Sequence, residues 1–577
     1  MADTVIKFTN FGFQYKVQQK PTLYDINLEI HRGEKILILG GSGSGKSTLA
    51  NCINGLIPFS YEGTVTGSVE VNGHSTADSS IHKLSKEVGT VLQDSDAQFV
   101  GLSVAEDIAF AMENECVPRS EMVPIVEERA ATVGMQDFLK ALPFDLSGGQ
   151  KQKVGIAGVL GSDVGILIFD EPLAALDPKM GETAIELIDQ LSEDQQRTII
   201  IIEHRLEDVL HRRVDRIILM SEGRIVADTT PDEILKGTLL QEYGIREPLY
   251  ITAMKYAGCT LEGNVGLSNI DNIVFTEDTR QKLLDFFASS VQPHEPQVGD
   301  ELVALKDVAF SYEGFDRKVL EDVSFAIHKG ERIAVVGMNG AGKSTAAKLI
   351  CGICRPNKGC ISIDGKDAKN LSIKEIGERV GYVMQNPNQM LVKDTIKNEV
   401  EYALTLRNLP REQIISRATD ALNACSLYPM RNWPVDTVSY GQKKRVTVAS
   451  ILVLQPDVLI LDEPSAGQDY RSYTEIMKFL NVLNQKYNKT IVFITHDMHL
   501  ALENTDRAIV FANGKLIKDD RTFAVLADDK TIQEANLKQT SLYRLANKLG
   551  LEPEKVIRHF IDYEHSRAKM AKEEEQK

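Results

Sequence analysis

Short runs of apolar residues, each about the length of one β-strand, recur along the chain and alternate with helical segments. They span Lys35–Leu39, Gly165–Phe169 and Thr198–Ile202 in the first half of the chain, and Arg332–Val336, Val458–Leu461 and Thr490–Ile494 in the second half. Continuous apolar strands that alternate with helices predict a mainly parallel sheet whose faces are covered by helices. The predicted fold class is therefore α/β.

This pattern occurs twice, with the same chemistry at the strand ends. Lys46 matches Lys343 and Tyr15 matches Tyr312, and the members of each pair are 297 residues apart. Further along, the separation becomes 292 residues, for the pairs Gln93 and Gln385, Ser147 and Ser439, Asp170 and Asp462, and His204 and His496. A constant separation over this length of chain indicates two copies of one domain.

The repeat divides the chain into four parts. We predict a first copy over residues 1–236, a connector over 237–300, a second copy over 301–525 and a C-terminal helical extension over 526–577. The connector is less regular than the copies, but Thr279–Ala288 has the pattern of a helix.

Each copy contains a Gly-x-x-x-x-Gly-Lys-Ser loop between a strand and a helix. The glycines allow backbone N–H groups to face phosphates, the lysine reaches the terminal phosphates, and the serine can ligate Mg²⁺. The candidate phosphate-binding residues are Gly40, Gly43, Gly45, Lys46, Ser47 and Thr48 in the first copy, and Gly337, Gly340, Gly342, Lys343, Ser344 and Thr345 in the second. Two such loops in the same strand-to-helix context predict two nucleotide-binding sites.

An acidic pair ends another strand in each copy. The pairs are Asp170-Glu171 and Asp462-Glu463. The two aspartates can orient Mg²⁺, whereas the two glutamates stand one residue further on, where a carboxylate can position and deprotonate an attacking water. Ligands bind beyond the carboxyl ends of parallel strands, so we expect both pairs to lie near the glycine loops.

The charge and composition of the chain limit the kinds of partner and the location that we expect for it. The 577 residues carry a formal net charge of −17, which argues against broad binding of nucleic acid. The longest apolar runs have the length of strands, not of a membrane-spanning helix, and the N-terminus lacks the features of a signal peptide. We therefore expect a cytoplasmic protein without a membrane anchor of its own.

The segment Leu146-Ser-Gly-Gly-Gln150 resembles the signature motif of ATP-binding cassette (ABC) ATPases. The resemblance extends over both copies and implies two P-loop nucleotide-binding domains, each a mainly parallel sheet with flanking helices and a helical subdomain. It also implies ATP and Mg²⁺ as ligands. The roles implied for further residues are adenine stacking by Tyr15 and Tyr312, metal and water contacts by Gln93 and Gln385, and γ-phosphate contact by His204 and His496.

In this family two cassettes dock head to tail, and each ATP lies between the phosphate loop of one cassette and the signature of the other. The resemblance implies that Ser147 and Gly149 complete the second site, and that Ser439 and Gly441 complete the first. The second signature has Tyr440 where the first has a small glycine, which could alter closure or rate. Both glutamates and both histidines are present, so two hydrolytic sites are expected.

The residues after the two glutamines are similar to the energy-coupling-factor branch of ABC importers. They read Gln93-Asp-Ser-Asp-Ala-Gln98-Phe-Val-Gly101 in the first copy and Gln385-Asn-Pro-Asn-Gln389 in the second, and Tyr440 fits the fused members of that branch. The resemblance implies a transmembrane coupling subunit and a small substrate-binding membrane subunit as partners, with a vitamin, a vitamin precursor, cobalt or nickel as cargo. The cytoplasmic face of the membrane is the implied location.

Two alternatives share the same cassette core. One is a soluble tandem cassette protein that acts on the ribosome, although that class usually has a long, charged helical connector and residues 236–300 are mixed in sequence. The other is a tandem sugar-importer ATPase, although that class usually has one visibly degraded half.

Overall fold

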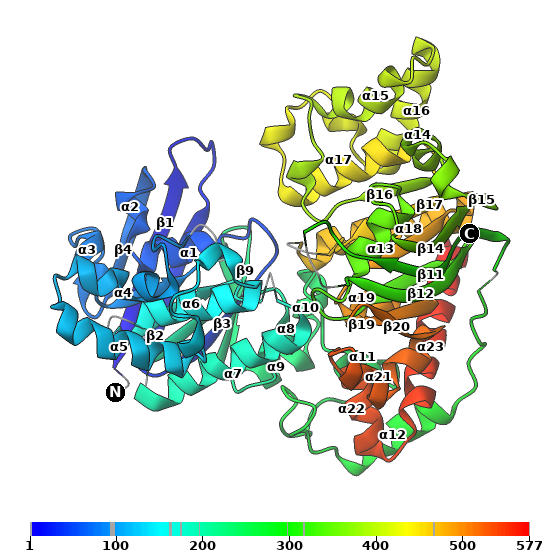
Figure 1. Cartoon of the computed structure of the whole chain (residues 1–577). Coiled ribbons are helices and arrows are strands. Elements are labelled where there is room, and N and C mark those ends of the chain that lie inside the picture. Colours follow the sequence, from blue (N-terminus) through cyan, green and yellow to red (C-terminus); the bar gives the residue numbers. More distant parts are fainter. Residues whose placement is uncertain are drawn as a thin grey trace. The chain divides into compact units, whose positions relative to one another are not determined.

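The computed structural model describes residues 3–92, 98–160, 164–173, 176–195, 197–296, 298–314, 318–465 and 468–575 (Figure 1). The chain forms two compact units, one made of Met1–Thr252 and Thr260–Thr276, the other of Ala253–Cys259 and Glu277–Lys577. The predicted residue Gln93 lies outside the described part.

The first unit contains a six-stranded sheet in the order β10-β9-β3-β8-β7-β6, in which only the pairing of β9 with β10 is antiparallel. A second, four-stranded sheet has the order β2-β1-β4-β5 and is antiparallel throughout. The strands are β1 (Thr4–Tyr15), β2 (Leu23–His31), β3 (Lys35–Leu39), β4 (Gly63–Val71), β5 (His74–Ser75), β6 (Val88–Val91), β7 (Ile166–Asp170), β8 (Thr198–Ile202), β9 (Arg216–Ser221) and β10 (Arg224–Thr229).

The helices of the first unit include α4 to α6, which pack against one another as a separate group. The helices of this unit are α1 (Lys46–Ile53), α2 (Leu56–Phe59), α3 (Ile81–Leu84), α4 (Val104–Asn114), α5 (Arg119–Thr132), α6 (Gly148–Leu160), α7 (Pro178–Gln195), α8 (Leu206–Val209), α9 (Pro231–Lys236), α10 (Leu239–Glu242) and α11 (Leu249–Tyr256). The boundary between the two units falls inside α11.

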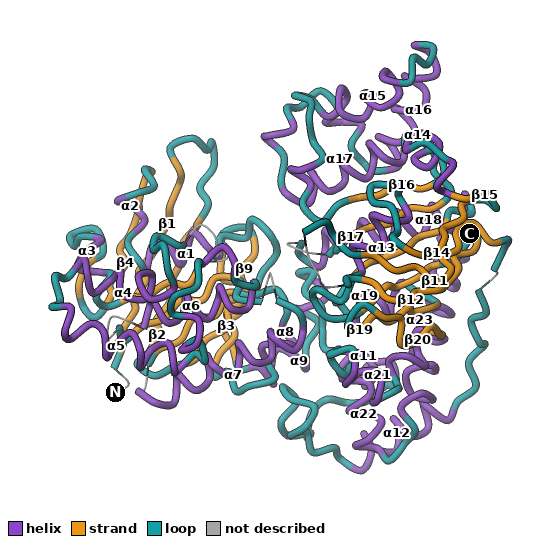
Figure 2. Tube along the Cα trace, viewed as in Figure 1, coloured by secondary structure: helices purple, strands orange, loops and turns teal. Residues whose placement is uncertain are grey.

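The second unit repeats this architecture, with a six-stranded sheet in the order β16-β17-β18-β13-β19-β20 and a four-stranded sheet in the order β12-β11-β14-β15 (Figure 2). Its strands are β11 (Glu301–Phe310), β12 (Leu320–His328), β13 (Arg332–Val336), β14 (Lys358–Ile363), β15 (Lys366–Asp367), β16 (Val380–Val383), β17 (Val458–Asp462), β18 (Thr490–Ile494), β19 (Arg507–Ala512) and β20 (Lys515–Arg521). The expectation of two α/β domains with mostly parallel sheets is confirmed. The antiparallel sheets are an addition that the apolar runs alone did not predict.

Helices α15 to α17 lie at one end of the second unit, and α12 and α21 to α23 lie at the other (Figure 1). The helices are α12 (Glu277–Ala288), α13 (Lys343–Ile350), α14 (Ile373–Gly377), α15 (Ile396–Leu406), α16 (Arg411–Ala424), α17 (Tyr440–Leu452), α18 (Tyr470–Tyr487), α19 (Met498–Asn504), α20 (Thr522–Leu526), α21 (Asp529–Glu534), α22 (Ser541–Leu549) and α23 (Pro553–Glu575). The predicted connector helix over Thr279–Ala288 is confirmed as α12.

Part of the connector packs against the C-terminal extension. The ring of Tyr256 stacks on Phe560 at 5.8 Å, and Phe286 meets Tyr563 edge to face at 5.0 Å. The backbone N–H of His294 donates to the carboxylate of Asp562 over 2.8 Å. Segments some 270 residues or more apart in the sequence therefore form one helical layer of the second unit.

The parallel strands place the predicted functional residues at one sheet edge in each unit. Strands β3, β7 and β8 are fully buried apart from the final Asp170, and they end at the glycine loop, the acidic pair and the histidine. In the second unit β13, β17 and β18 do the same. Buried apolar strands thus fix the positions of polar groups that extend beyond them.

Candidate active site

The two glycine loops hold their lysines in the same way. In the first unit Lys46 Nζ donates to the carbonyl oxygens of Gly40 and Gly41, over 2.8 and 2.9 Å. In the second, Lys343 Nζ donates to Gly337 and Met338, over 2.6 and 3.0 Å. Each lysine is therefore folded onto its own loop, at the start of the helix whose N-terminal N–H groups favour anions.

The last glycine of each loop is required by its backbone. Gly45 and Gly342 precede α1 and α13 with φ of 102° and 103°, in a region that residues with a side chain rarely adopt. A Cβ on Gly45 would lie 2.7 Å from Leu23, and one on Gly342 would lie 2.5 Å from Leu320. The left-handed φ, together with the close approach of Leu23 or Leu320, therefore disfavours a side chain at this position.

The glutamate and the histidine predicted at neighbouring strand ends are in direct contact in both units. His204 Nε2 lies 2.6 Å from Glu171 Oε1, and His496 Nδ1 lies 2.7 Å from Glu463 Oε1. The side chains are mostly buried, with 16% of Glu171 and 8% of Glu463 exposed. Both glutamates have a left-handed backbone, with φ of 48° and 46°, which is uncommon outside glycine and is concentrated at functional sites.

In the first acidic pair, the pKa values of the two carboxylates shift in opposite directions. Burial raises the pKa of Asp170 and of Asp462 above the ordinary aspartate value. Burial also acts to raise the pKa of Glu171, but the hydrogen bond and charge of His204, with Lys46, outweigh it and hold that pKa below its usual value. Glu171 is therefore kept ionised, as a residue that accepts a proton from water requires.

The donor set beside each loop fits a hard divalent cation. Ser47 hydrogen-bonds to Asp170, and Asp170 Oδ1 is buried with no hydrogen-bond partner among the described residues. Ser344 hydrogen-bonds to Asp462 in the second unit. Hydroxyl and carboxylate oxygens are the ligands that Mg²⁺ prefers, and an unpaired buried carboxylate oxygen is the atom such an ion would satisfy.

Three polar residues of the second site were not identified from the sequence. Tyr382 donates its hydroxyl to Asp462 Oδ2 over 2.8 Å, Thr495 donates to Glu463 Oε2 over 3.3 Å, and Lys444 Nζ donates to the Glu463 carbonyl oxygen over 2.6 Å. The positions 292 residues earlier are Thr90, Glu203 and Gln152. A comparison of the two copies position by position could have found all three, because the copies differ at each.

The tyrosines predicted to stack on adenine contact the phosphate-loop threonines, and the signature serines lie at helix starts. The hydroxyls of Tyr15 and Thr48 are 3.2 Å apart, and the same distance separates those of Tyr312 and Thr345. The signature serines cap helices: the backbone N–H of Gln150 donates to Ser147 Oγ over 3.4 Å, and that of Gln442 donates to Ser439 Oγ over 3.3 Å. Gly149 is tightly covered by Met180, whereas Gly441 is not crowded.

The structure links the unusual signature tyrosine to the second glutamine. The hydroxyl of Tyr440 donates to the backbone carbonyl of Gln385 over 3.3 Å. Gln385 itself is exposed, and its counterpart Gln93 is outside the described residues. The tyrosine thus contacts the segment that follows β16 in its own unit.

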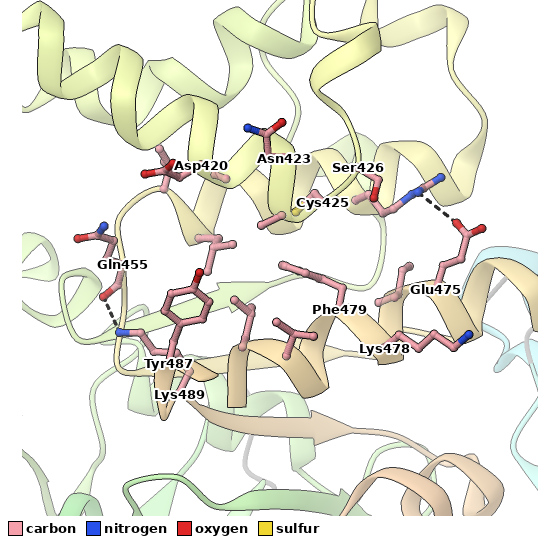
Figure 3. Close-up of a pocket in the computed structure, with 18 of the residues that line it drawn as sticks. Asp420, Asn423, Cys425, Ser426, Gln455, Glu475, Lys478, Phe479, Tyr487 and Lys489 are labelled. Carbon is pink, nitrogen blue, oxygen red and sulfur yellow. Dashed lines mark hydrogen bonds and ion pairs between the residues drawn. The ribbon is translucent and has the colours of Figure 1, made fainter. Parts of the chain in front are cut away.

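A cavity of about 1240 Å³ lies apart from this chemistry, between α16, α17 and α18 of the second unit (Figure 3). Phe479, Tyr487 and Leu452 are among its apolar lining residues, and Arg445 and Glu475 form an ion pair of 3.2 Å at its wall. None of the predicted site residues lines it. The predicted nucleotide-binding residues therefore lie outside this cavity.

Among the described residues, no helix combines the length and the apolar character needed to cross a lipid bilayer.

Comparison with known proteins agrees with the geometry. The family model described as "ABC transporter" matches residues 23–174 and 320–466, and the model described as "ATP-binding cassette cobalt transporter" matches residues 237–310. An ABC transporter ATP-binding protein of Clostridium perfringens is 52% identical and is aligned over 97% of this chain and 98% of its own length. One of Enterococcus faecalis is 52% identical, over 98% and 99%.

A protein of the same description from Vibrio parahaemolyticus is 50% identical over 97% of this chain and 96% of its own. Among solved structures, cbiO1 from Clostridium perfringens, part of the ABC transporter complex cbiONQ, is 31% identical and covers 43% of this chain and 99% of its own, with a TM-score of 0.39. Two family matches at the two glycine loops, together with relatives aligned over nearly the whole length, establish what the chain is. It belongs to the ABC transporter ATP-binding proteins, as a tandem ATPase that carries two cassettes in one polypeptide and resembles the energy-coupling-factor type.

Proposed function

We propose that this chain is the energising subunit of an energy-coupling-factor type importer for a vitamin, a vitamin precursor, cobalt or nickel. The observation that carries the proposal is the match of residues 237–310 to the cobalt transporter family. This segment lies entirely outside the two regions that match the general ABC transporter model, so it supports a particular branch of the family.

The partners in this proposal are a transmembrane coupling subunit and a small substrate-binding membrane subunit. The chain acts at the cytoplasmic face of the membrane and contributes both ATPase halves. Binding of ATP and of the membrane subunits both favour a closed arrangement of the cassettes, and this shared preference couples hydrolysis to transport.

Within each site we assign the roles by chemistry. Glu171 and Glu463 act as general bases toward the attacking water, and His204 and His496 position them and contact the γ-phosphate. The direct contacts between these side chains, at 2.6 and 2.7 Å, support the assignment. Gln93 and Gln385 are assigned to the metal and the attacking water, and Tyr15 and Tyr312 to adenine.

We assign Mg²⁺ to Ser47 and Asp170 in the first site and to Ser344 and Asp462 in the second. When bound, the ion would neutralise charge on the phosphates. The buried, unpaired Asp170 Oδ1 supports this assignment. The signature of the opposite cassette completes each ATP-binding site. Ser439 and Gly441 complete the first site, and Ser147 and Gly149 complete the second.

We further propose that the chain is divided into four parts. The cassettes occupy residues 1–236 and 301–525, the connector 237–300 and the extension 526–577. The packing of Tyr256 and Phe286 on α23 supports a structural association of the connector with the extension.

Purification of the tagged, full-length chain from its native membrane tests the proposal. Mass spectrometry is expected to identify small hydrophobic membrane proteins in a fixed ratio to the chain, retained in mild detergent. Recovery of ribosomal proteins without membrane subunits would overturn the proposal in favour of a translation factor.

A further inference from the structure

The lysine beneath the second catalytic pair is the most unusual buried group of the site. Lys444 lies on α17 and is only 2% exposed, which places it among the largest fully buried side chains. Lysine is rarely buried to this extent, because removal of the ammonium group from water is costly unless partners replace the lost hydration. Its Nζ donates to the backbone carbonyl of Glu463 over 2.6 Å.

The first copy has an uncharged residue at the matching position. Gln152 occupies the matching position on α6 and is 8% exposed. Its amide donates to the carbonyl oxygen of Pro172, one residue beyond the catalytic glutamate of that copy. The two copies therefore differ both in the charge beneath the pair and in the peptide that is held.

The ammonium group also lies near the carboxylates of the pair. Burial lowers the pKa of Lys444 to about 8, while the charges of Glu463 and Asp462 favour its protonated form. The side chain is thus largely cationic at neutral pH. Glu463 is the residue with φ of 46°, so the held peptide is one whose backbone is strained.

We propose that Lys444 is a positioning residue of the second site, which anchors the strained Glu463 peptide and so orients the carboxylate that receives the proton of the attacking water. This inference rests on the proposed role of Glu463. The two sites then differ at this position: the charged Lys444 holds the peptide of Glu463, whereas the neutral Gln152 holds the carbonyl of the residue that follows Glu171.

The test uses the full-length chain with Glu171→Gln, so that hydrolysis reports on the second site. In this background Lys444→Met keeps the volume and removes the charge and the donor, and Lys444→Gln introduces the group found in the other copy. Both are expected to lower kcat by about tenfold or more, the scale of a lost hydrogen bond to a charged group. The KM for ATP is expected to change by less than about twofold, because an interaction that positions only the base does not contribute to binding.

Lys443→Gln is the matched control, because Lys443 is the neighbouring lysine and its Nζ donates to Asn388 over 3.3 Å rather than to the Glu463 peptide. It is expected to leave kcat unchanged. The thermal midpoint of Lys444→Met is expected to fall by less than about 3 °C, because an apolar residue avoids the cost of a buried charge.

Two results would overturn the inference. One is a kcat of Lys444→Met within twofold of its background. The other is a loss of activity matched by a large fall in the thermal midpoint, which would indicate a purely structural lysine. Glu463→Gln in the same background tests the role of Glu463 separately from that of Lys444. If this variant leaves hydrolysis intact, the proposed role of Glu463 fails, and the role of Lys444 fails with it.

Discussion

Replacement of His204 by alanine should slow the first site through the loss of one contact. The pair of His204 and Glu171 is short, at 2.6 Å, and both side chains are more than four-fifths buried. A hydrogen bond to a charged group in such a setting contributes about 1.5–3 kcal/mol, which corresponds to roughly 10- to 150-fold in rate. The pKa of Glu171 should rise in the variant, because burial acts to raise it and His204 is the largest opposing cause.

The assay is single-turnover hydrolysis in a Glu463→Gln background, where only the first site retains its base. There His204→Ala is expected to lower the rate 10- to 150-fold. In the Glu171→Gln, Glu463→Gln double variant the same change should cost less than about twofold, since residues that act through one contact are not additive. An equal loss in both backgrounds would refute the reasoning, because His204 would then act independently of Glu171.

Three further outcomes are expected. Asp506→Asn should lower the free energy of unfolding by about 3–5 kcal/mol, because Arg332 is left buried beside a neutral group; urea unfolding measures it, and a loss under about 1 kcal/mol would contradict it. Since Arg332 and His294 hold the pKa of Asp506 far below its usual value despite burial, this contribution should be present above about pH 4 and disappear as the pH falls further. Asp170→Asn in a Glu463→Gln background should raise the Mg²⁺ concentration for half-maximal hydrolysis about tenfold or more, and an unchanged Mg²⁺ titration would exclude Asp170 from the metal site. Phe560→Ala should destabilise the second unit by about 3–5 kcal/mol, because the ring is 1% exposed and stacks on Tyr256; a wild-type denaturation midpoint would show that this packing is dispensable.

The sequence predicts the positions of the catalytic groups because they follow from one physical rule. The strands Lys35–Leu39 and Thr198–Ile202 are continuous apolar runs, and parallel strands bring their carboxyl ends to the same sheet edge. The glycine loop, the acidic pair and the histidine of each copy can therefore be placed together from the sequence alone.

The sequence does not predict how these groups contact one another. Glu171 and Glu463 adopt a left-handed backbone, although glutamate has no intrinsic preference for it, so only the surrounding fold imposes that conformation. The use of Nε2 in His204 and Nδ1 in His496 toward the glutamate likewise depends on side-chain packing.

The packing of the connector against the extension cannot be predicted from the sequence, for a different reason. Tyr256 and Phe560 lie in segments more than three hundred residues apart, and no repeat or motif connects them. Apolar runs do not predict the antiparallel sheets, because β1 and β11 mix buried and exposed positions irregularly and pair with register shifts.

Single-turnover hydrolysis by Glu171→Gln, Glu463→Gln and the double variant measures whether both copies hydrolyse ATP, as proposed. Each glutamate is in direct contact with a histidine and has a left-handed backbone, so each single variant should slow hydrolysis but retain the activity of the other site. The double variant should fall nearly to the background rate. If either single variant hydrolyses ATP at the wild-type rate, one of the two sites is not catalytic and the account is contradicted.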